Sequence, residues 1–319
     1  MEHSAWPPVR EPIEKSSAEP RVATLSAATL DATEGAGRDL VAALRAGGCV
    51  YAEDEAAILM GACRTRAELE GMIAQRVAGI PLEHLVGWAE FCGLRMVVAP
   101  GVFVPRRRSE FLVRQTLTEL AGHPCGERQL KILDLCTGSG AVGAALARSL
   151  PDCELHVADV DPVALACAAQ NVAAFGGKVY CGDLFDPVPD SLQGSFDVIV
   201  ANAPYVPTEA IAFMPREARV YEPMAALDGG ADGLALHRRI AAQAPLWLGK
   251  DGILLVESSA RQAETTAAIL VSQGFSVSVS TSEELGGTVV AGRLSPAPVA
   301  APGKVFIKAA KPAKRWGTG

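Results

Sequence analysis

One stretch of the chain brings together a carboxamide, an extended backbone and an aromatic ring. The residues from Val198 to Ala201 are apolar and mostly β-branched, which is typical of a strand buried on both sheet faces. The strand is followed by Asn202, Ala203, Pro204 and Tyr205, and it must end there because proline cannot donate to a sheet ladder. Open α/β sheets bind ligands at the carboxyl ends of their strands. Asn and Pro are also common in plain turns, so this stretch needs support from the rest of the chain.

That support comes from a glycine-rich loop after an earlier predicted strand. Asp134-Leu-Cys-Thr-Gly-Ser-Gly140 lies between a short apolar strand and a helix of small residues. Glycines allow the backbone to approach a ligand closely, and the start of the helix offers unpaired N–H groups. Asp159 ends the next predicted strand, 159 − 140 = 19 residues after Gly140. A carboxylate at this distance binds ribose hydroxyls, so the pattern predicts a cofactor that contains adenosine.

The charge of this loop distinguishes between a dinucleotide such as NAD and a cationic cofactor. Gly138, Gly140 and Gly143 satisfy the dinucleotide pattern, but Asp134 would repel a pyrophosphate and no basic residue stands beside it. The same carboxylate attracts the amino group or the sulfonium of S-adenosylmethionine, which we therefore favour over NAD. We predict that the cofactor contacts Asp134, Cys136, Thr137, Gly138, Ser139, Gly140, Asp159, Val160, Asp183, Leu184 and Asn202.

Two of these residues have a narrower expected role. Asp183 follows the third predicted strand and could accept a hydrogen bond from the adenine amino group, with Leu184 beside the ring. A loop aspartate without this role is nearly as good an interpretation of Asp183.

If a methyl donor binds at the glycine loop, the stretch from Asn202 to Tyr205 is placed to hold the group that accepts the methyl. The side-chain oxygen of Asn202 and the carbonyl of Ala203 could hold both hydrogens of a planar NH₂ group, and Tyr205 could cover its flat face. No strong base is needed, because the sulfonium is already a good electrophile. We therefore predict a catalytic role for Asn202, Ala203, Pro204 and Tyr205. The same geometry would serve an N6-adenine or N4-cytosine amine of nucleic acid, flipped out of its stack.

Composition limits the partners of the protein. The 319 residues carry a formal net charge of −7 with a pI of about 5.4, which argues against stable nucleic-acid binding. The eight cysteines are scattered without metal-ligand spacing, so we expect no metal site and a reducing cytoplasm. No apolar run reaches 18 residues, and we expect no membrane partner. The sequence makes no prediction of oligomeric state.

The elements that position these residues divide the chain into five parts. We expect a disordered lead over residues 1–20, a helical N-terminal substrate-recognition domain over 21–80 and a β-hairpin linker over 81–100. Residues 101–295 alternate strands and helices, which predicts an α/β catalytic domain with a parallel sheet. Residues 296–319 are rich in Ala, Pro and Lys and are expected to form a mobile basic tail. The strands are expected at 131–135, 154–158, 178–181, 198–201, 253–256, 275–279 and 288–291.

Between about Gly79 and Arg293, the chain resembles the HemK-like protein-(glutamine-N5) methyltransferases. The likeness is carried by Pro81-Leu-Glu-His-Leu-Val-Gly-Trp-Ala-Glu-Phe-Cys-Gly-Leu94, Pro100-Gly-Val-Phe-Val-Pro-Arg106, the loop from Asp134 to Gly140, the stretch from Asn202 to Tyr205, and Tyr221-Glu-Pro-Met-Ala-Ala-Leu-Asp-Gly-Gly-Ala-Asp-Gly-Leu234. The last block is the most specific, since generic methyltransferases lack it.

This resemblance implies a class I S-adenosylmethionine methyltransferase fold, Rossmann-like and seven-stranded, with an antiparallel last strand. It also implies methylation of the glutamine in a Gly-Gly-Gln loop of a class I peptide chain release factor, which the helical domain would receive. The substrate-binding residues implied by the likeness are Arg106, Glu110, Glu222 and Pro223.

Two departures from the family pattern affect these expectations. Ala203 replaces the first proline of Asn-Pro-Pro-Tyr, which keeps the carbonyl but frees one φ angle. Pro105-Arg-Arg-Arg-Ser-Glu110 replaces Pro-Arg-Pro-Glu-Thr-Glu, so that Arg107 and Arg108 add two charges beside the site entrance. These differences leave open a paralogue that methylates a ribosomal-protein glutamine, and a paralogue that binds without turnover.

Overall fold

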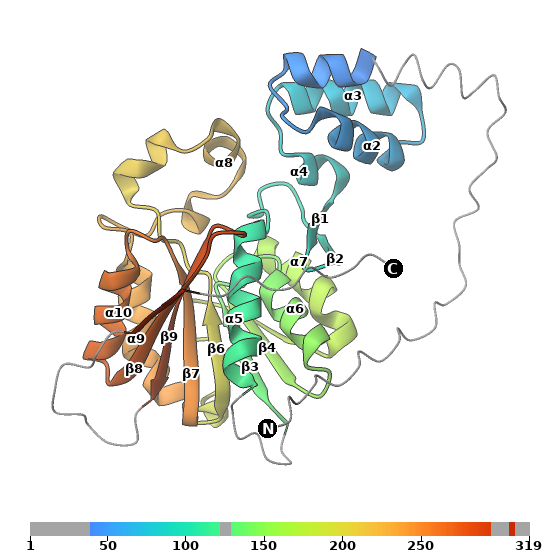
Figure 1. The fold of residues 1–319 in the computed structure, drawn as a ribbon. Coiled ribbons are helices and arrows are strands. Elements are labelled where there is room, and N and C mark those ends of the chain that lie inside the picture. Colours follow the sequence, from blue (N-terminus) through green and yellow to red (C-terminus); the bar gives the residue numbers. More distant parts are fainter. Residues whose placement is uncertain (1–38, 122–128, 295–305, 310–319) are drawn as a thin grey trace, which may run out of the picture.

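The computed structural model describes residues 39–121, 129–294 and 306–309, and its main body is a sheet with helices on both faces (Figure 1). A smaller group of helices precedes this body and lies beside its upper edge in the figure. The expected disordered lead, residues 21–38 of the helical domain and most of the expected tail lie outside the described residues.

The N-terminal helices form a small core of their own. Residues 39–46 are helical, and they are followed by α2 (Ala52–Ala62), α3 (Arg66–Val77) and α4 (Leu82–Val86). Thr65 begins α3 with a capping box, in which its hydroxyl accepts from the Glu68 N–H while the Glu68 carboxylate accepts from the Thr65 N–H. Leu44 and Leu59 are fully buried between these helices.

The hairpin expected over residues 81–100 is shorter than predicted. Its strands are β1 (Trp88–Phe91) and β2 (Leu94–Val97), which pair antiparallel, whereas Leu82–Val86 is helical. Pro81 precedes this helix and Gly87 ends it in the left-handed conformation, with φ 79°. A five-residue stretch of mixed apolar and polar residues between proline and glycine fits either structure, so its pattern alone misled the prediction.

The main sheet has eight strands within the described residues, in the order β10-β8-β9-β7-β6-β3-β4-β5. The strands are β3 (Lys131–Leu135), β4 (Glu154–Asp159), β5 (Lys178–Cys181), β6 (Phe196–Ala201), β7 (Leu248–Ser258), β8 (Phe275–Ser282), β9 (Gly287–Leu294) and β10 (Phe306–Ala309). The first seven in sequence reproduce the predicted sheet, because β9 lies between β7 and β8 and is antiparallel to both.

The eighth strand corrects the expectation of an unstructured tail. β10 pairs parallel with β8, with Phe306 opposite Ser278. Without it, β8 would present an unpaired edge, and a short stretch of chain with strand-forming residues can complete such an edge.

Alternate residues of the central strands are buried against opposite helical layers. Ile132 and Val198 belong to a core shared with α5 (Glu110–Leu120), α6 (Ala141–Ser149) and α7 (Pro162–Val172). Leu133 and Ile199 belong to a second core, with α9 (Ala235–Trp247) and α10 (Ala263–Ser272) (Figure 1). The strand period of two therefore explains why both faces are covered.

A long segment after β6 carries short helices that the sequence did not predict. They are η4 (Thr208–Phe213), α8 (Arg216–Tyr221) and η5 (Met224–Ala226). The remaining short helices are η1 (Arg107–Ser109), η2 (Ala173–Phe175) and η3 (Asp190–Leu192). Each of α8 and η5 begins after a proline, which fixes φ and ends the preceding extended chain.

Candidate functional site

A cavity of about 710 Å³ opens at the carboxyl ends of β3, β4 and β6. It brings together most of the residues predicted from the sequence. The predicted residues that line it are Arg106, Asp134, Cys136, Thr137, Gly138, Ser139, Asp159, Val160, Asp183, Leu184, Asn202, Ala203, Pro204, Tyr205 and Pro223. Gly140, Glu110 and Glu222 are not among the lining residues.

At the base of the glycine loop, Asp134 is a buried carboxylate. One of its oxygens, Oδ2, accepts from the Thr137 hydroxyl at 2.6 Å and from the Gly143 N–H at 2.9 Å. Burial raises the pKa of Asp134 to about 7, against the opposing effect of these hydrogen bonds. The carboxylate is therefore costly to ionise, and a cation nearby would stabilise its charged form.

The loop between Asp134 and α6 depends on glycine at two positions. Gly138 and Gly140 have φ values of 56° and 80°, in the left-handed region. A Cβ at Gly140 would also lie 3.1 Å from the Cα of Ala168, so α6 and α7 pack closely there. Gly140 thus supports the loop from behind the cavity wall, although it was predicted to contact the cofactor.

Asp159 ends β4 and faces the same loop. Its Oδ2 accepts from the Gly138 N–H at 2.8 Å, and its Oδ1 accepts from the Asp161 N–H at 2.9 Å. Burial raises the pKa of Asp159, opposed by these backbone donors. Val160, directly after it, is 59% exposed although it is apolar. An apolar side chain left open beside a fixed carboxylate suits the flat face of a nucleoside.

Asp183 and Leu184 lie on the far wall of the cavity. The Oδ2 of Asp183 accepts from Nη2 of Arg239 in α9 at 2.6 Å, a partner that the sequence did not indicate. Leu184 is buried and has a φ of 49°. Arg239 fixes the direction of the Asp183 carboxylate.

On the opposite side, the loop after β6 forms what we call the acceptor clamp, residues 202–205. Nδ2 of Asn202 donates to Oγ of Ser109 at 3.1 Å, which directs its carbonyl oxygen away from Ser109. Ala203 is buried at the cavity wall. The Tyr205 hydroxyl donates to Oε1 of Glu257 at 3.1 Å, and burial raises the pKa of Tyr205.

The two added arginines have different environments. Arg108 lines the cavity, where its Nε lies 3.4 Å from Oε1 of Glu257 and its guanidinium lies 5.8 Å from the centre of the Tyr205 ring. Arg107 is exposed. Burial raises the pKa of Glu257, and Ser109 and Arg108 oppose this effect. Arg108 therefore packs into the clamp as well as changing the charge of its entrance.

The predicted substrate residues separate into two groups. Arg106 lines the cavity and its Nη2 lies 2.5 Å from Oε1 of the buried Glu222, which also accepts from the Val104 N–H at 3.2 Å. Pro223 follows at the cavity wall. Glu110 instead accepts from the Cys92 N–H at 3.3 Å, so it fixes the hairpin against α5.

Sequence reasoning missed Ser109, Glu257 and Glu217 as parts of the site. Glu257 follows the apolar residues of β7, just as Asp134 and Asn202 come at the ends of their strands. That shared position could have revealed it. Glu217 lines the cavity from α8, an element that gave no clear periodic pattern.

Neither a metal centre nor a membrane-spanning helix is found among the described residues. In that part of the chain, no cluster of three or more His, Cys, Asp or Glu side chains could hold a metal ion. Across the same ranges, no helix is both long and apolar enough to cross a membrane.

Comparisons with known proteins agree on one kind of enzyme. A family model described as "Methyltransferase small domain" matches residues 93–227. The release factor glutamine methyltransferase of Geobacter sulfurreducens is 39% identical over 218 residues, which cover 68% of this chain and 72% of that protein. The protein of the same name from Agrobacterium fabrum is 36% identical over 211 residues, which cover 66% of this chain and 73% of that protein.

Proposed function

The chain belongs to the release factor glutamine methyltransferase family, and from this premise we propose that it methylates the side-chain nitrogen of a glutamine in a peptide chain release factor. Members of this family are S-adenosylmethionine-dependent methyltransferases, and the chain is one of them. The expected target is the glutamine of a Gly-Gly-Gln loop, as the resemblance in sequence implies.

The glycine-loop side of the cavity fits the methyl donor. Asp134 and Asp159 are carboxylates whose pKa values burial raises, so a bound cation would favour their ionised forms. S-adenosylmethionine carries a sulfonium and an ammonium, and it supplies an activated methyl group. We propose that Asp134 attracts this positive charge, that Asp159 accepts from ribose hydroxyls, and that Asp183 and Leu184 contact the adenine.

The acceptor clamp would hold the glutamine amide for transfer. We propose that Oδ1 of Asn202 and the carbonyl of Ala203 each accept one N–H of the amide, which turns its nitrogen toward the donor. Tyr205 would cover the plane of the amide. The new N–C bond forms as the S–C bond breaks, and the amide then loses one proton to solvent, giving N5-methylglutamine.

A protein substrate would explain two features outside the cavity, the helical domain and the negative net charge. We propose that the helical domain, from residue 39 to about 80, contacts the release factor. The Gly-Gly-Gln loop of the release factor enters the cavity at the same time. An acidic chain with a net charge of −7 suits a protein acceptor better than a nucleic acid. Release factors act on ribosomes, so we propose a cytoplasmic location.

The observation that carries the proposal is the Ser109–Asn202 hydrogen bond, because it leaves the side-chain oxygen of Asn202 for an acceptor amide at the cavity wall. The test is incubation of the protein with methyl-labelled S-adenosylmethionine and a purified release factor. We expect mass spectrometry to find one added methyl group on the Gly-Gly-Gln glutamine. A release factor with that glutamine changed to asparagine is the matched control and should stay unlabelled.

A lack of label at that glutamine would contradict the proposed target. Label on DNA or RNA, lost steeply as salt rises, would instead support the nucleic-acid alternative.

A further inference from the structure

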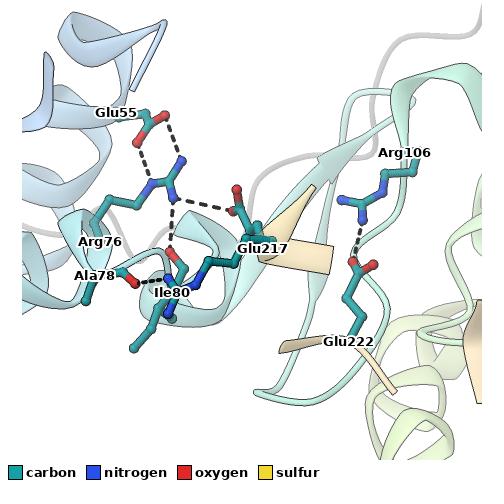
Figure 2. A network of polar contacts seen from close by, with 8 residues as sticks. Glu55, Arg76, Ala78, Ile80, Arg106, Glu217 and Glu222 are labelled. Atoms are coloured by element: carbon teal, nitrogen blue, oxygen red, sulfur yellow. Dashed lines mark hydrogen bonds and ion pairs between the residues drawn. The ribbon is translucent and has the colours of Figure 1, made fainter. Parts of the chain in front are cut away.

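Arg76, at the end of α3, connects the helical domain to the wall of the cavity. Its Nε and Nη2 contact the two carboxylate oxygens of Glu55 in α2, at 2.6 and 3.2 Å. Its Nη1 donates to the Ile80 carbonyl at 3.2 Å and lies 3.4 Å from Oε1 of Glu217 in α8. Figure 2 shows the guanidinium between these three partners. This side chain of α3 therefore contacts one other helix of the small domain, α2, and one helix of the catalytic domain, α8.

A second arginine belongs to the catalytic domain and contacts the helical domain. Nη1 of Arg216, the first residue of α8, donates to the Ala78 carbonyl at 2.8 Å. The next residue, Gly79, has a φ of 99°, and a Cβ there would lie 2.9 Å from Nη1 of Arg216. The glycine leaves the space that this guanidinium needs. We call the Arg76–Glu217 and Arg216–Ala78 contacts the interdomain contacts.

The catalytic side of these contacts is part of the cavity wall. Met214, Pro215, Glu217 and Ala218 line the cavity, and all four lie in or next to α8. The other end of α8 is also fixed, because Glu222 caps it and pairs with Arg106 (Figure 2). α8 therefore has two separate anchors: the interdomain contacts near its start, and the Glu222–Arg106 pair at its end, which still holds the cavity wall when the interdomain contacts are removed.

The Arg76–Glu55 ion pair inside the helical domain is more deeply buried than the Arg76–Glu217 contact between the domains. The side chains of Arg76 and Glu55 are only 13% and 12% exposed, and their two-bond geometry holds the guanidinium rigidly. Glu217 is 41% exposed. The buried pair belongs to the fold of the small domain, so a neutral pair in its place can remove the contact with Glu217 without leaving a buried charge alone.

We propose that Arg76 and Arg216 are positioning residues that set the helical domain over the cavity, and thereby determine that the enzyme prefers a folded protein to a short peptide. A folded release factor must contact the helical domain and place its glutamine in the cavity at the same time. A peptide needs the cavity alone. Loss of the interdomain contacts should therefore weaken binding of the protein substrate and leave the chemical step unchanged. This inference rests on the proposed function.

The test compares three variants, none altering a residue that lines the cavity. The first, Glu55→Gln/Arg76→Gln/Arg216→Ala, removes both interdomain contacts and keeps a neutral pair inside the domain. The second, Glu55→Gln, keeps both contacts and is the matched control. The third, Arg66→Ala, removes an exposed ion pair with Glu70 on the same helix and controls for loss of a surface arginine.

We expect the triple variant to raise KM for a full-length release factor at least about tenfold, because two contacts are lost and a single charge-assisted hydrogen bond already corresponds to about this factor. Its kcat, its cofactor affinity and its rate on a short synthetic Gly-Gly-Gln peptide should match those of the two controls. An unchanged KM for the release factor overturns the inference, as does a fall in kcat or a parallel loss of rate on the peptide.

Hydrogen exchange separates this result from a failure of the proposed function. If the unaltered protein does not methylate the release factor, the proposed function fails. The amides of residues 216–221 should still exchange faster in the triple variant than in Glu55→Gln, because α8 has lost its contacts with the helical domain. Equal exchange in the two variants would overturn the inference independently of activity.

Discussion

The two sides of the cavity are built from contacts of very different sequence separation. On the cofactor side, the Asp134 carboxylate bonds to residues 3 and 9 positions away, and Asp159 bonds to Gly138, 21 positions away. On the acceptor side, Asn202 bonds to Ser109 across 93 positions, and Tyr205 to Glu257 across 52. The glycine-loop part of the cofactor side is formed by a strand, its loop and the next strand, although Asp183 pairs with Arg239 across 56 positions. The acceptor side depends throughout on distant segments that meet.

The two sides should therefore differ in their tolerance to substitution. A local loop retains its shape as long as its glycines and carboxylates are present. The acceptor side depends on packing between η1, β6 and β7, so a change in any of these segments can move the clamp. Ala203 and Arg108, the departures from the family pattern at the cavity wall, both lie on this side.

Replacement of Asn202 by alanine should have the largest effect and should separate the two sides. We expect kcat to fall by about 10²–10³-fold, because one of two oriented acceptors for the amide is lost. The affinity for S-adenosylmethionine, measured by calorimetry, should change little, since the cofactor side keeps its own contacts. If the variant stayed fully active, the role assigned to Asn202 would be wrong.

Replacement of Asp159 by alanine should give the complementary result. We expect the Kd for S-adenosylmethionine to rise by about 10–100-fold, the range for loss of hydrogen bonds to a charged group. The Gly138 N–H also loses its acceptor, so the loop should become less ordered. Asp190→Asn, at the start of a short helix away from the cavity, is the control. A variant with normal cofactor affinity would exclude Asp159 from the site.

The contacts of the glycine loop are easier to anticipate from the sequence than those of the acceptor side, for the same physical reason. Asp134, the glycines and Asp159 are recognisable from local order, because strand, loop and helix follow each other directly. The partner of Asn202 could not be found in this way, since nothing in the sequence near position 202 indicates Ser109.

Among the elements, strand and helix alternation predicted the α/β sheet, and the family resemblance implied its seven strands and the antiparallel β9. It failed where short segments depend on tertiary contacts. The five residues of α4 were assigned to a hairpin, and α8 was missed because its six residues are too few to show a helical period. β10 was assigned to a mobile tail, since its pairing with β8 cannot be read from its own sequence.

Charge reversal at Arg108 should affect only the acceptor side. Arg108→Glu would place a carboxylate beside the buried Glu257, and the repulsion should displace the Tyr205 hydroxyl from its partner. We expect kcat/KM for the release factor to fall about tenfold, a modest effect because the Arg108 side chain is 46% exposed. Cofactor affinity should be unchanged.

Arg107→Glu makes the same change of charge at the neighbouring exposed position and is the matched control for Arg108→Glu. Equal losses in the two variants would mean that Arg108 acts through the overall charge of the entrance. A loss confined to Arg108→Glu would assign the effect to its contact with Glu257.

The smallest predicted effect concerns acid stability, in which the two sides should respond with opposite signs. His237 in α9 is fully buried, and its ring lies 6.5 Å from that of Tyr205 on the acceptor side. Burial lowers its pKa to about 4 from an ordinary value of 6.5, aided by Arg238 and opposed by Asp232. As the pH falls below 6.5, the unfolded chain takes up a proton that the folded protein refuses, so stability falls.

For this single group, the loss between pH 8 and pH 6 is about 0.8 kcal/mol. His237→Gln keeps a hydrogen-bonding group for Thr266. Between pH 8 and pH 6, its free energy of unfolding in urea titrations should fall by about 0.8 kcal/mol less than that of the unaltered protein. The raised pKa of Asp134 has the opposite sign, because its folded form takes up a proton more readily than the unfolded chain as the pH falls through about 7. Asp134→Asn should therefore lose more stability than the unaltered protein on the same acidification, and identical pH slopes in all three proteins would contradict both assignments.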